Sequence, residues 1–191
     1  MDQDRVFDAI EMFDKYRQVM FIQQRTIYQH LKYEISPSDK VLEAGCGIGL
    51  GTAILATSDC SITGTDKIKK NVEFAQCVYP WLDFDVWDIT KPTLRSADLV
   101  VAIEVLEHVV DQPSALVNLL DVADHNVWLS VPNGTGKPFP PENPHHTREY
   151  TPQEMLDMIG PFHVDIRCWE TWKKLDVDTL VDPLVYRIRK S

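Results

Sequence analysis

Long apolar runs, paired cysteines and an excess of basic residues are all missing from this sequence, and each absence excludes a class of protein. No stretch reaches the roughly 18 consecutive apolar residues that a membrane helix needs. Residues 1–16 are acidic and amphipathic, and they lack the basic start of a signal peptide. The four cysteines show no C-x-x-C spacing, so reduced thiols are expected. These absences predict a cytoplasmic protein that does not contact a membrane.

The charge balance argues against broad nucleic-acid binding, and the length fits one domain. The chain has 19 Lys and Arg residues against 29 Asp and Glu residues, for a net charge of −10. Sequence-independent binding of nucleic acids needs many basic contacts to phosphates. With 191 residues, 44% of them apolar, the chain can bury its own core. We predict a single domain over residues 1–191, with N-terminal helices or a lid at 1–36 and the core at 37–191.

Short apolar runs alternate with helical patterns from Lys40 onward. We expect strands at residues 41–44, 61–65, 81–86, 98–103, 126–131, 162–169 and 184–188. We expect helices over about the first 35 residues, at 49–56, 68–78 and 113–122, and from 152 onward. This alternation is typical of an α/β Rossmann-like fold, in which helices cover both faces of a seven-stranded, mostly parallel sheet. Ligands in such sheets bind beyond the carboxyl ends of the strands, so residues that directly follow strands are candidate site residues.

The loop after the first expected strand is rich in glycine. It contains Glu43, Gly45, Cys46, Gly47 and Gly49. Glycine has no Cβ, so the backbone can turn tightly there and approach a ligand closely. The dinucleotide fingerprint G-x-G-x-x-G would need glycine at position 50, which is Leu50. The spacing G-x-G-x-G, with an acidic residue two places before it, instead resembles motif I of the class I methyltransferases that use S-adenosylmethionine (SAM).

That resemblance implies the class I methyltransferase fold and a SAM site built on this loop. The cofactor has a cationic sulfonium and a zwitterionic methionine end, so a neighbouring Glu43 is compatible with it. Asp66 follows the second strand, where a carboxylate can accept hydrogen bonds from both ribose hydroxyls. The family often has an apolar residue next, against the adenine. Here the aliphatic stem of Lys67, or Ile68, would take that place.

Further cofactor contacts are implied on the third strand and on the N-terminal helix. Asp88 follows the third strand and would accept a hydrogen bond from the adenine amino group, while the backbone amide of Ile89 would meet a ring nitrogen. Arg25 is the N-terminal candidate for the cofactor carboxylate, because family members often place a basic residue on this helix.

A group of ionisable residues follows the fourth expected strand, in the segment from Glu104 to His108. Glu104, Glu107 and His108 are spaced so that they would share one face of a helical turn. Three ionisable groups in a mainly apolar neighbourhood suggest a site. Glu104 and Val105 would flank the cofactor.

This segment resembles two kinds of methyltransferase. The first kind acts on small molecules and includes the O-methyltransferases of the ubiquinone pathway. The second kind is metal-dependent and methylates the 2′-hydroxyl at the 3′ end of small RNAs. Its ligand pattern implies that Glu104, Glu107, His108 and His146 would bind Mg²⁺ or Mn²⁺, with the nitrogen ligands favouring Mn²⁺. We favour the interpretation without a metal, because the pattern after His146 also occurs in methyltransferases that have none.

These observations predict transfer of the SAM methyl group to an oxygen or nitrogen of a small molecule, with S-adenosylhomocysteine as the product. A hydroxyl acceptor must lose a proton, and histidine suits that task near neutral pH. His108 is the first candidate base, followed by His145 or His146, and Glu107 belongs to the same catalytic group. Two alternatives stay open: a metal-dependent RNA 2′-O-methyltransferase, and a SAM-binding module without turnover. The segments that could form a lid are short, so a lid completed by a second copy of the chain, in a homodimer, would follow.

Overall fold

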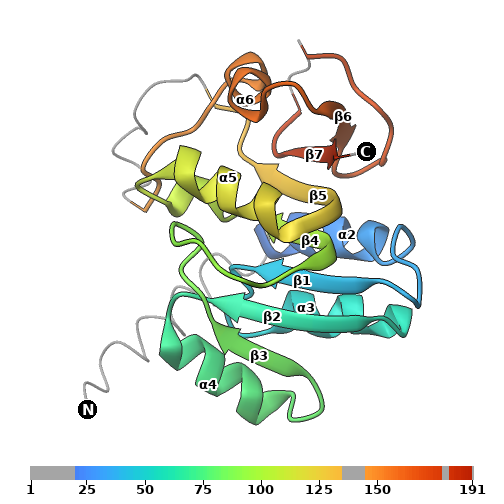
Figure 1. Ribbon diagram of the computed structural model, residues 1–191. Helices are drawn as coiled ribbons and strands as arrows, with labels where there is room; N and C mark the ends of the chain where they lie inside the picture. Colours follow the sequence, from blue (N-terminus) through green and yellow to red (C-terminus); the bar gives the residue numbers. More distant parts are fainter. Residues whose placement is uncertain (1–19, 135–144, 178–180, 191) are drawn as a thin grey trace.

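One mixed sheet of seven strands organises the computed structural model, which describes residues 20–134, 145–177 and 181–190 (Figure 1). The strands are β1 (Lys40–Ala44), β2 (Ser61–Asp66), β3 (Asp83–Val86), β4 (Ala97–Ile103), β5 (Ala123–Val131), β6 (His163–Cys168) and β7 (Leu184–Arg189). Their order across the sheet is β3-β2-β1-β4-β5-β7-β6. Strands β1 to β5 pair in parallel, whereas β7 is antiparallel to both of its neighbours. The predicted Rossmann-like, mostly parallel sheet is confirmed.

Two of the described helices begin at residues whose side chains satisfy free backbone groups. The described helices are α2 (Met20–Leu31), α3 (Leu50–Leu55), α4 (Lys69–Val78), α5 (Gln112–Val122) and α6 (Pro152–Ile159). Asp111 accepts a hydrogen bond from the amide of Ser114 at the start of α5. Thr151 and Glu154 form a reciprocal capping box at the start of α6, as their spacing indicates.

The predicted N-terminal helix is only partly within the described residues. Residues 1–19 lie outside them, and α2 ends at Leu31 rather than near residue 35. No helix among the residues that the structure describes is both long and apolar enough to cross a membrane.

The two faces of the sheet bury separate sets of apolar side chains. Val41 of β1 packs in a cluster with Ile27 and Leu31 of α2 and Leu55 of α3. Its neighbour Leu42 belongs to the larger cluster on the opposite face, which includes residues of α5 and α6. This alternation is the expected consequence of strand geometry, because successive side chains point to opposite faces. Figure 1 accordingly shows α5 in front of the sheet, with α2 and α3 behind it.

The strand order reverses between β1 and β4, and this reversal fixes where a ligand can bind. The chain leaves β1 toward β2 on one side and leaves β4 toward β5 on the other. The loops that follow β1 and β4 therefore diverge and leave a crevice at the carboxyl ends of these strands. The glycine-rich loop after β1 and the segment Glu104–His108 after β4 are the two walls of that crevice.

Candidate active site

The glycine-rich loop turns sharply out of β1 and needs its glycines for defined steric reasons. Gly45 has φ of 72°, and a Cβ there would lie 2.5 Å from Cγ2 of Val105. Gly49 has φ of 87°, caps the start of α3, and would place a Cβ 2.8 Å from the ring of Phe84. Both positions combine a left-handed backbone with a crowded surrounding, which only glycine tolerates without strain.

Glu43 lies beneath this loop rather than in contact with open space. Its side chain is completely buried, and it accepts hydrogen bonds from the hydroxyls of Tyr28 on α2 and Thr52 on α3. Burial raises the pKa of Glu43 to about 6, although the two hydroxyls oppose that shift. Both carboxylate oxygens hold α2 and α3 against β1, and a direct contact between Glu43 and the cofactor stays a prediction.

Asp66 joins the end of β2 to the glycine-rich loop. One carboxylate oxygen accepts from the amide of Gly47 at 3.0 Å, and the other accepts from the amide of Ile68 at 2.8 Å. The side chain is 8% exposed, and that exposed part lines a cavity. Asp66 thus fixes the loop that precedes α3 while it keeps a carboxylate edge toward the crevice.

Two adjoining cavities fill the crevice, and they meet at two residues. The larger cavity has a volume of about 420 Å³ and the smaller about 210 Å³. Gly45 and Glu104 line both cavities, so they form the boundary between them. A ligand made of two linked parts could therefore extend across this boundary, with one part in each cavity.

Most predicted cofactor residues line one of these cavities. The larger cavity is lined by Gly45, Asp66, Lys67, Ile68, Asp88, Ile89, Glu104, Val105 and His108 among the predicted residues. The smaller cavity is lined by Arg25, Gly45, Cys46, Gly47 and Glu104. Glu43 and Gly49 line neither cavity, because one supports the loop from below and the other packs against Phe84. Gly49 is therefore a backbone requirement of the loop, and its contact with the cofactor stays a prediction.

Asp88 stands at the rim of the larger cavity in a turn that follows β3. Its carboxylate accepts hydrogen bonds from the amide and the hydroxyl of Thr90 at 3.0 and 2.8 Å. These bonds lower the pKa of Asp88, because they stabilise its charged form. An ionised carboxylate at this rim is a suitable acceptor for an amino group of a bound base.

Glu104 has an uncommon backbone conformation at the boundary between the cavities. Its φ is 55°, and its amide donates to the carbonyl of Ser130 on the neighbouring strand β5. Its carboxylate accepts from the hydroxyl of Ser130 at 2.7 Å. Burial raises the pKa of Glu104 to about 7, and the negative charges of Asp182 and Glu149 act in the same direction.

The helical turn after β4 differs from the prediction. It is a short 3-10 turn that covers Leu106–His108 and excludes Glu104, which lies before it in the left-handed region. Glu104 therefore does not share a helical face with Glu107 and His108. Its carboxylate is turned toward Ser130 instead, so the predicted four-residue metal set does not form as one group.

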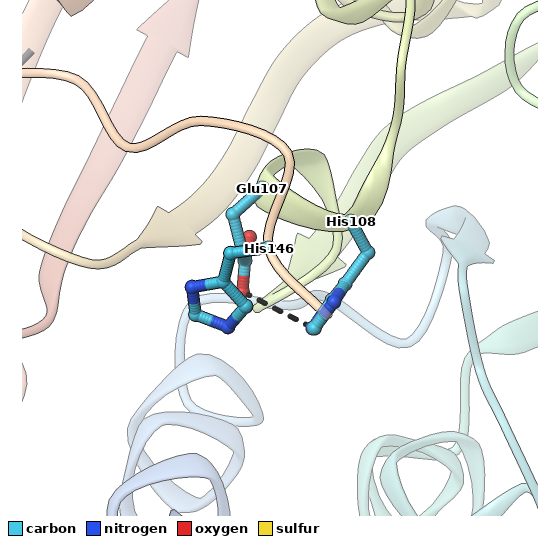
Figure 2. A group of neighbouring side chains, drawn as sticks. All are labelled: Glu107, His108 and His146. Atoms are coloured by element: carbon cyan, nitrogen blue, oxygen red, sulfur yellow. Dashed lines mark ion pairs between the residues drawn. The ribbon is translucent and has the colours of Figure 1, made fainter. Parts of the chain in front are cut away.

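A second cluster forms where Glu107 and His108 meet His146, which comes from the segment before α6 (Figure 2). The Nε2 atom of His108 lies 3.7 Å from Oε1 of Glu107. The side chains of Glu107 and His146 are 1% and 5% exposed, whereas that of His108 is 39% exposed and lines the larger cavity. Burial lowers the pKa of the His108 imidazole. The structure thus brings three of the four predicted catalytic residues together.

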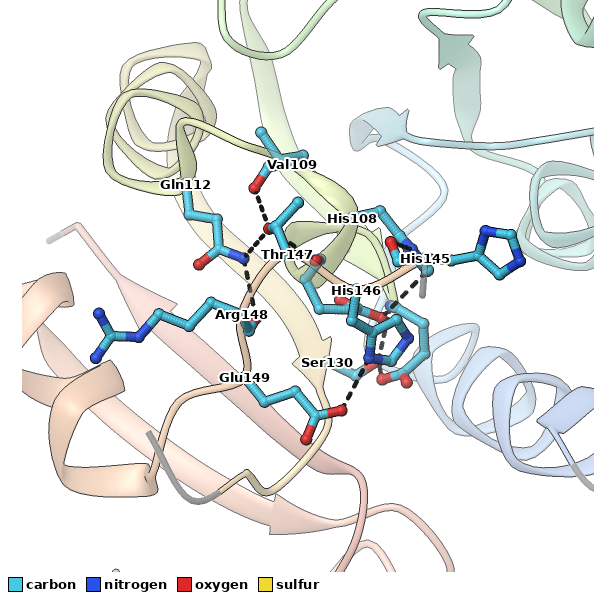
Figure 3. Close-up of polar contacts among 11 residues, drawn as sticks. His108, Val109, Gln112, Ser130, His145, His146, Thr147, Arg148 and Glu149 are labelled. Atoms are coloured by element: carbon cyan, nitrogen blue, oxygen red, sulfur yellow. Dashed lines mark hydrogen bonds and ion pairs between the residues drawn. The ribbon is translucent and has the colours of Figure 1, made fainter. Parts of the chain in front are cut away.

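His145, the fourth predicted catalytic residue, contributes its backbone instead. Its carbonyl lies 3.0 Å from Nδ1 of His108, and the residue itself is exposed. Figure 3 shows its ring pointing away from His108 and His146. His145 therefore contributes its backbone carbonyl, which orients the ring of His108, and its own exposed ring takes no part in the cluster.

Several residues of the site carried no signal in the sequence. Tyr28 and Thr52 donate their hydroxyls to the buried Glu43, and Ser130 donates its hydroxyl to the half-buried Glu104. Nothing in their spacing indicates these roles. Trp87, Thr90, Val109 and Val110 also line the larger cavity. Of these, Trp87 had a usable signal, because it directly precedes Asp88 at the end of an expected strand.

Comparison with known proteins identifies the family to which this chain is similar. The Methyltransferase domain family matches residues 42–129, which begin within β1, include β2 to β4 and end within β5. A probable S-adenosylmethionine-dependent methyltransferase of Mycolicibacterium smegmatis is 31% identical over 147 residues, which are 73% of this chain and 56% of that protein. This chain belongs to the class I SAM-dependent methyltransferases. SAM is the cofactor of this family.

Other relatives and solved structures agree with this assignment. The human mitochondrial ubiquinone biosynthesis O-methyltransferase is 32% identical over 123 residues, which are 58% of this chain and 33% of that enzyme. The chain therefore spans about half or less of the length of these relatives. The structure of a TehB-like SAM-dependent methyltransferase from Corynebacterium glutamicum matches with a TM-score of 0.71 and 16% identity, covering 98% of this chain and 97% of that one.

A further structural match has cofactor product bound. It is the magnesium protoporphyrin IX methyltransferase of Synechocystis with bound SAH, which matches with a TM-score of 0.64 and 18% identity over the whole of both chains. At such identities, the two structural matches establish the fold. The methyltransferase then has its two cavities at the carboxyl edge of β1 and β4, where this fold class binds ligands.

Proposed function

We propose that this chain transfers the methyl group of SAM to an oxygen or nitrogen of a small-molecule acceptor, with oxygen preferred. The adenosine of SAM would lie in the larger cavity, with its ribose at Asp66 and its adenine near Asp88 and Ile89. The methionine part would extend past Gly45 and Glu104 into the smaller cavity, with its carboxylate toward Arg25. This orientation places the sulfonium at the boundary that the two cavities share.

One observation supports an acceptor at this place more than any other: His108 lines the same cavity as Glu104 and Val105. Methyl transfer is an in-line displacement, so the acceptor atom must stand about 3 Å from the methyl carbon, opposite to sulfur. An imidazole on that wall could remove the proton of an acceptor hydroxyl as the new bond forms. The methyl–sulfur bond breaks in the same step, and S-adenosylhomocysteine leaves.

A small acceptor is preferred to RNA for reasons of charge and size. The net charge of −10 opposes a long polyanion, whereas a small neutral molecule is not affected. The related ubiquinone biosynthesis enzyme is named as an O-methyltransferase, which supports an oxygen acceptor here. This proposal also includes a cytoplasmic location, a lid at residues 1–36 and a homodimer that completes the site. Size-exclusion chromatography with light scattering would test the dimer.

The function is tested by turnover at saturating SAM with a panel of hydroxylated aromatic compounds and amines. We expect S-adenosylhomocysteine to form with at least one hydroxylated acceptor. His108→Ala should lower that rate by about 10²- to 10⁴-fold, because the proton would have no local acceptor. The matched control is His163→Ala, an exposed histidine on β6 that lines neither of these cavities. Equal rates in both variants would contradict the assigned role of His108.

A further inference from the structure

Three aromatic rings join α2 to the sheet in one stack. The ring centroid of His30, in the last turn of α2, lies 4.9 Å from that of Trp172, and the two planes differ by 15°. The ring centroid of Trp172 lies 5.3 Å from that of Trp128 on β5, with planes 21° apart. The guanidinium of Arg167 lies 5.3 Å from the Trp128 ring and 5.4 Å from the Trp172 ring. Guanidinium groups are attracted to indole faces, so Arg167 strengthens the contact between the two indoles.

Trp172 has a backbone conformation that a bulky residue rarely adopts. Its φ is 57°, which lies in the left-handed region. Such a residue is strained and keeps this conformation only when its surroundings hold it there. Here its amide donates to the carbonyl of Cys168 at 2.9 Å, and its indole N–H donates to the carboxylate of Glu34. The fold therefore holds this indole in place against a local strain, which points to a role beyond filling space.

The carboxylate of Glu34 joins this stack to the turn that follows α2. Its Oε1 accepts hydrogen bonds from Nε1 of Trp172 at 3.0 Å and from Nη1 of Arg167 at 3.3 Å. Its Oε2 lies 3.8 Å from Nη1 of Arg187 on β7. These three charged side chains are between 14% and 25% exposed, so water screens their charges only in part. One carboxylate thus balances two guanidinium groups, and its removal would leave two neighbouring positive charges without a partner.

Two residues of the connection between β6 and β7 hold α2 near both of its ends. Nε2 of His30 lies 3.2 Å from the carbonyl of Glu170. Near the start of the helix, the side chain of Gln23 donates to the carbonyl of Asp182 at 3.3 Å. Apolar residues such as Leu31 also pack α2 against the sheet, but apolar packing is not directional. The polar contacts at the two ends therefore fix the rotation of α2 and its position along its axis.

The part of α2 between these two ends carries residues of the candidate active site. Gln24 and Arg25 line the smaller cavity, and the hydroxyl of Tyr28 donates to Glu43 beneath the glycine-rich loop. Because α2 is one continuous helix, a rotation or shift at its end moves these side chains together. Groups that align a reacting molecule tolerate little displacement, so the contacts that hold α2 bear on the cofactor.

We propose that Glu34 and Trp172 are positioning residues for the cofactor, because through α2 they place Arg25 at the smaller cavity. This inference rests on the proposed function, in which the methionine part of SAM lies in that cavity with its carboxylate toward Arg25. Neither Glu34 nor Trp172 lines the cavity, so neither would touch the cofactor itself. Their substitution should therefore lower affinity for the amino-acid part of SAM and leave affinity for its nucleoside part unchanged.

Calorimetric titration with SAM and with 5′-methylthioadenosine, its analogue without the amino-acid part, tests this selectivity. Glu34→Ala should weaken SAM binding by about three- to fivefold and leave binding of the analogue unchanged, because α2 loses the contact that fixes its end. Glu34→Gln keeps an oxygen for the N–H of Trp172 and should restore most of the affinity. Glu73→Ala removes an ion-paired, exposed carboxylate of α4 and is the matched control. An equal loss for both ligands in Glu34→Ala, or no loss for either, would overturn the proposal.

A double-mutant cycle tests whether Glu34 acts through Arg25. In an Arg25→Ala background, Glu34→Ala should weaken SAM binding by less than about twofold further, because the side chain that it positions is already missing. If the two losses multiply instead, Glu34 does not act through Arg25 and the proposal fails. Should Glu34→Ala not fold, Trp172→Phe replaces it in both experiments, since phenylalanine keeps an aromatic ring in the stack and lacks the N–H that reaches Glu34.

Turnover distinguishes this inference from the proposed function. Both binding experiments use no acceptor, so a selective loss of SAM affinity supports the positioning role even if no acceptor is methylated. If an acceptor is methylated and Glu34→Ala keeps the kcat and the KM for SAM of the unmodified protein, the proposed function stands and the positioning role fails. Unchanged SAM affinity in Arg25→Ala alone would refute the placement of the methionine part, and the positioning role with it.

Discussion

Two buried glutamates, Glu43 and Glu107, show how differently one residue type is used on the two walls of the crevice. Both side chains are almost completely removed from solvent. Glu43 accepts hydrogen bonds from Tyr28 and Thr52, whereas Glu107 has no hydrogen-bond partner for either oxygen. The carboxylate beneath the glycine-rich loop therefore has its hydrogen bonds without a ligand, whereas the carboxylate after β4 has none. Binding of the cofactor and handling of the acceptor should consequently respond to different substitutions.

The largest expected effect is on the cofactor side of this comparison. Gly45→Ala should weaken SAM binding by about 100-fold, because it combines a left-handed φ with a methyl group against Val105. Calorimetric titration with SAM measures this loss of affinity. Gly160→Ala is the matched control, since Gly160 has φ of 77° but a Cβ added there would meet nothing within 4 Å. It should lose stability and keep SAM affinity. Comparable loss of SAM affinity in both variants would exclude a specific role for the glycine-rich loop.

The second-largest expected effect is on the free energy of unfolding, and it differs between the carboxylates of Glu43 and Glu107. Tyr28→Phe should lower the free energy of unfolding by about 2 kcal/mol, because it leaves one oxygen of Glu43 buried without a partner. Glu107→Gln should change it little, because neither carboxylate oxygen of Glu107 has a hydrogen bond to lose. Urea denaturation measures both, and Tyr33→Phe, at 81% exposure, is the control for loss of a tyrosine hydroxyl. Equal destabilisation by Tyr28→Phe and Tyr33→Phe would mean that Glu43 does not hold α2.

The pH dependence of stability should reveal Glu43 directly. Its pKa is about 6 in the folded protein against 4.5 for the ordinary group, so the folded state binds more protons between these values. The free energy of unfolding therefore falls as pH rises through that window, by about 2 kcal/mol from this group. Tyr28, Cys46 and Asp66 face the same carboxylate, so the measurement is the difference between the unmodified protein and Glu43→Gln. Identical pH slopes in the two proteins would refute the assignment.

The smallest expected effect distinguishes the two cavities. Arg25 lines the smaller cavity at an exposed position, so Arg25→Ala should weaken SAM binding by only about fivefold. Binding of 5′-methylthioadenosine, which lacks the amino-acid part, should not change. A loss of affinity for both ligands would place the amino-acid end of the cofactor elsewhere.

The parts of the fold that depend on local pattern could be predicted from the sequence. The strands alternate with helices because their apolar periodicities differ, and the capping residues of α5 and α6 are short-range signals. The placement of Asp66 and Asp88 after successive strands also followed, because parallel strands end at one edge of the sheet.

The parts that depend on contacts between distant segments could not be predicted. Nothing local marks Tyr28 as the partner of Glu43, which is 15 residues away, or Thr147 as the partner of Glu107, 40 residues away. The left-handed conformation of Glu104 was also missed, since it depends on Ser130 of a neighbouring strand. Non-glycine residues with positive φ are held by such surroundings and not by their own preference.

The position of β7 has a consequence for how the chain reaches its native state. This strand follows β6 in sequence but lies between β5 and β6 in the sheet. β6 pairs only with β7, so β6 joins the rest of the sheet only through the pairing of β7 with β5. Pairings of this kind join residues far apart in sequence, and they slow folding because a long loop must close first.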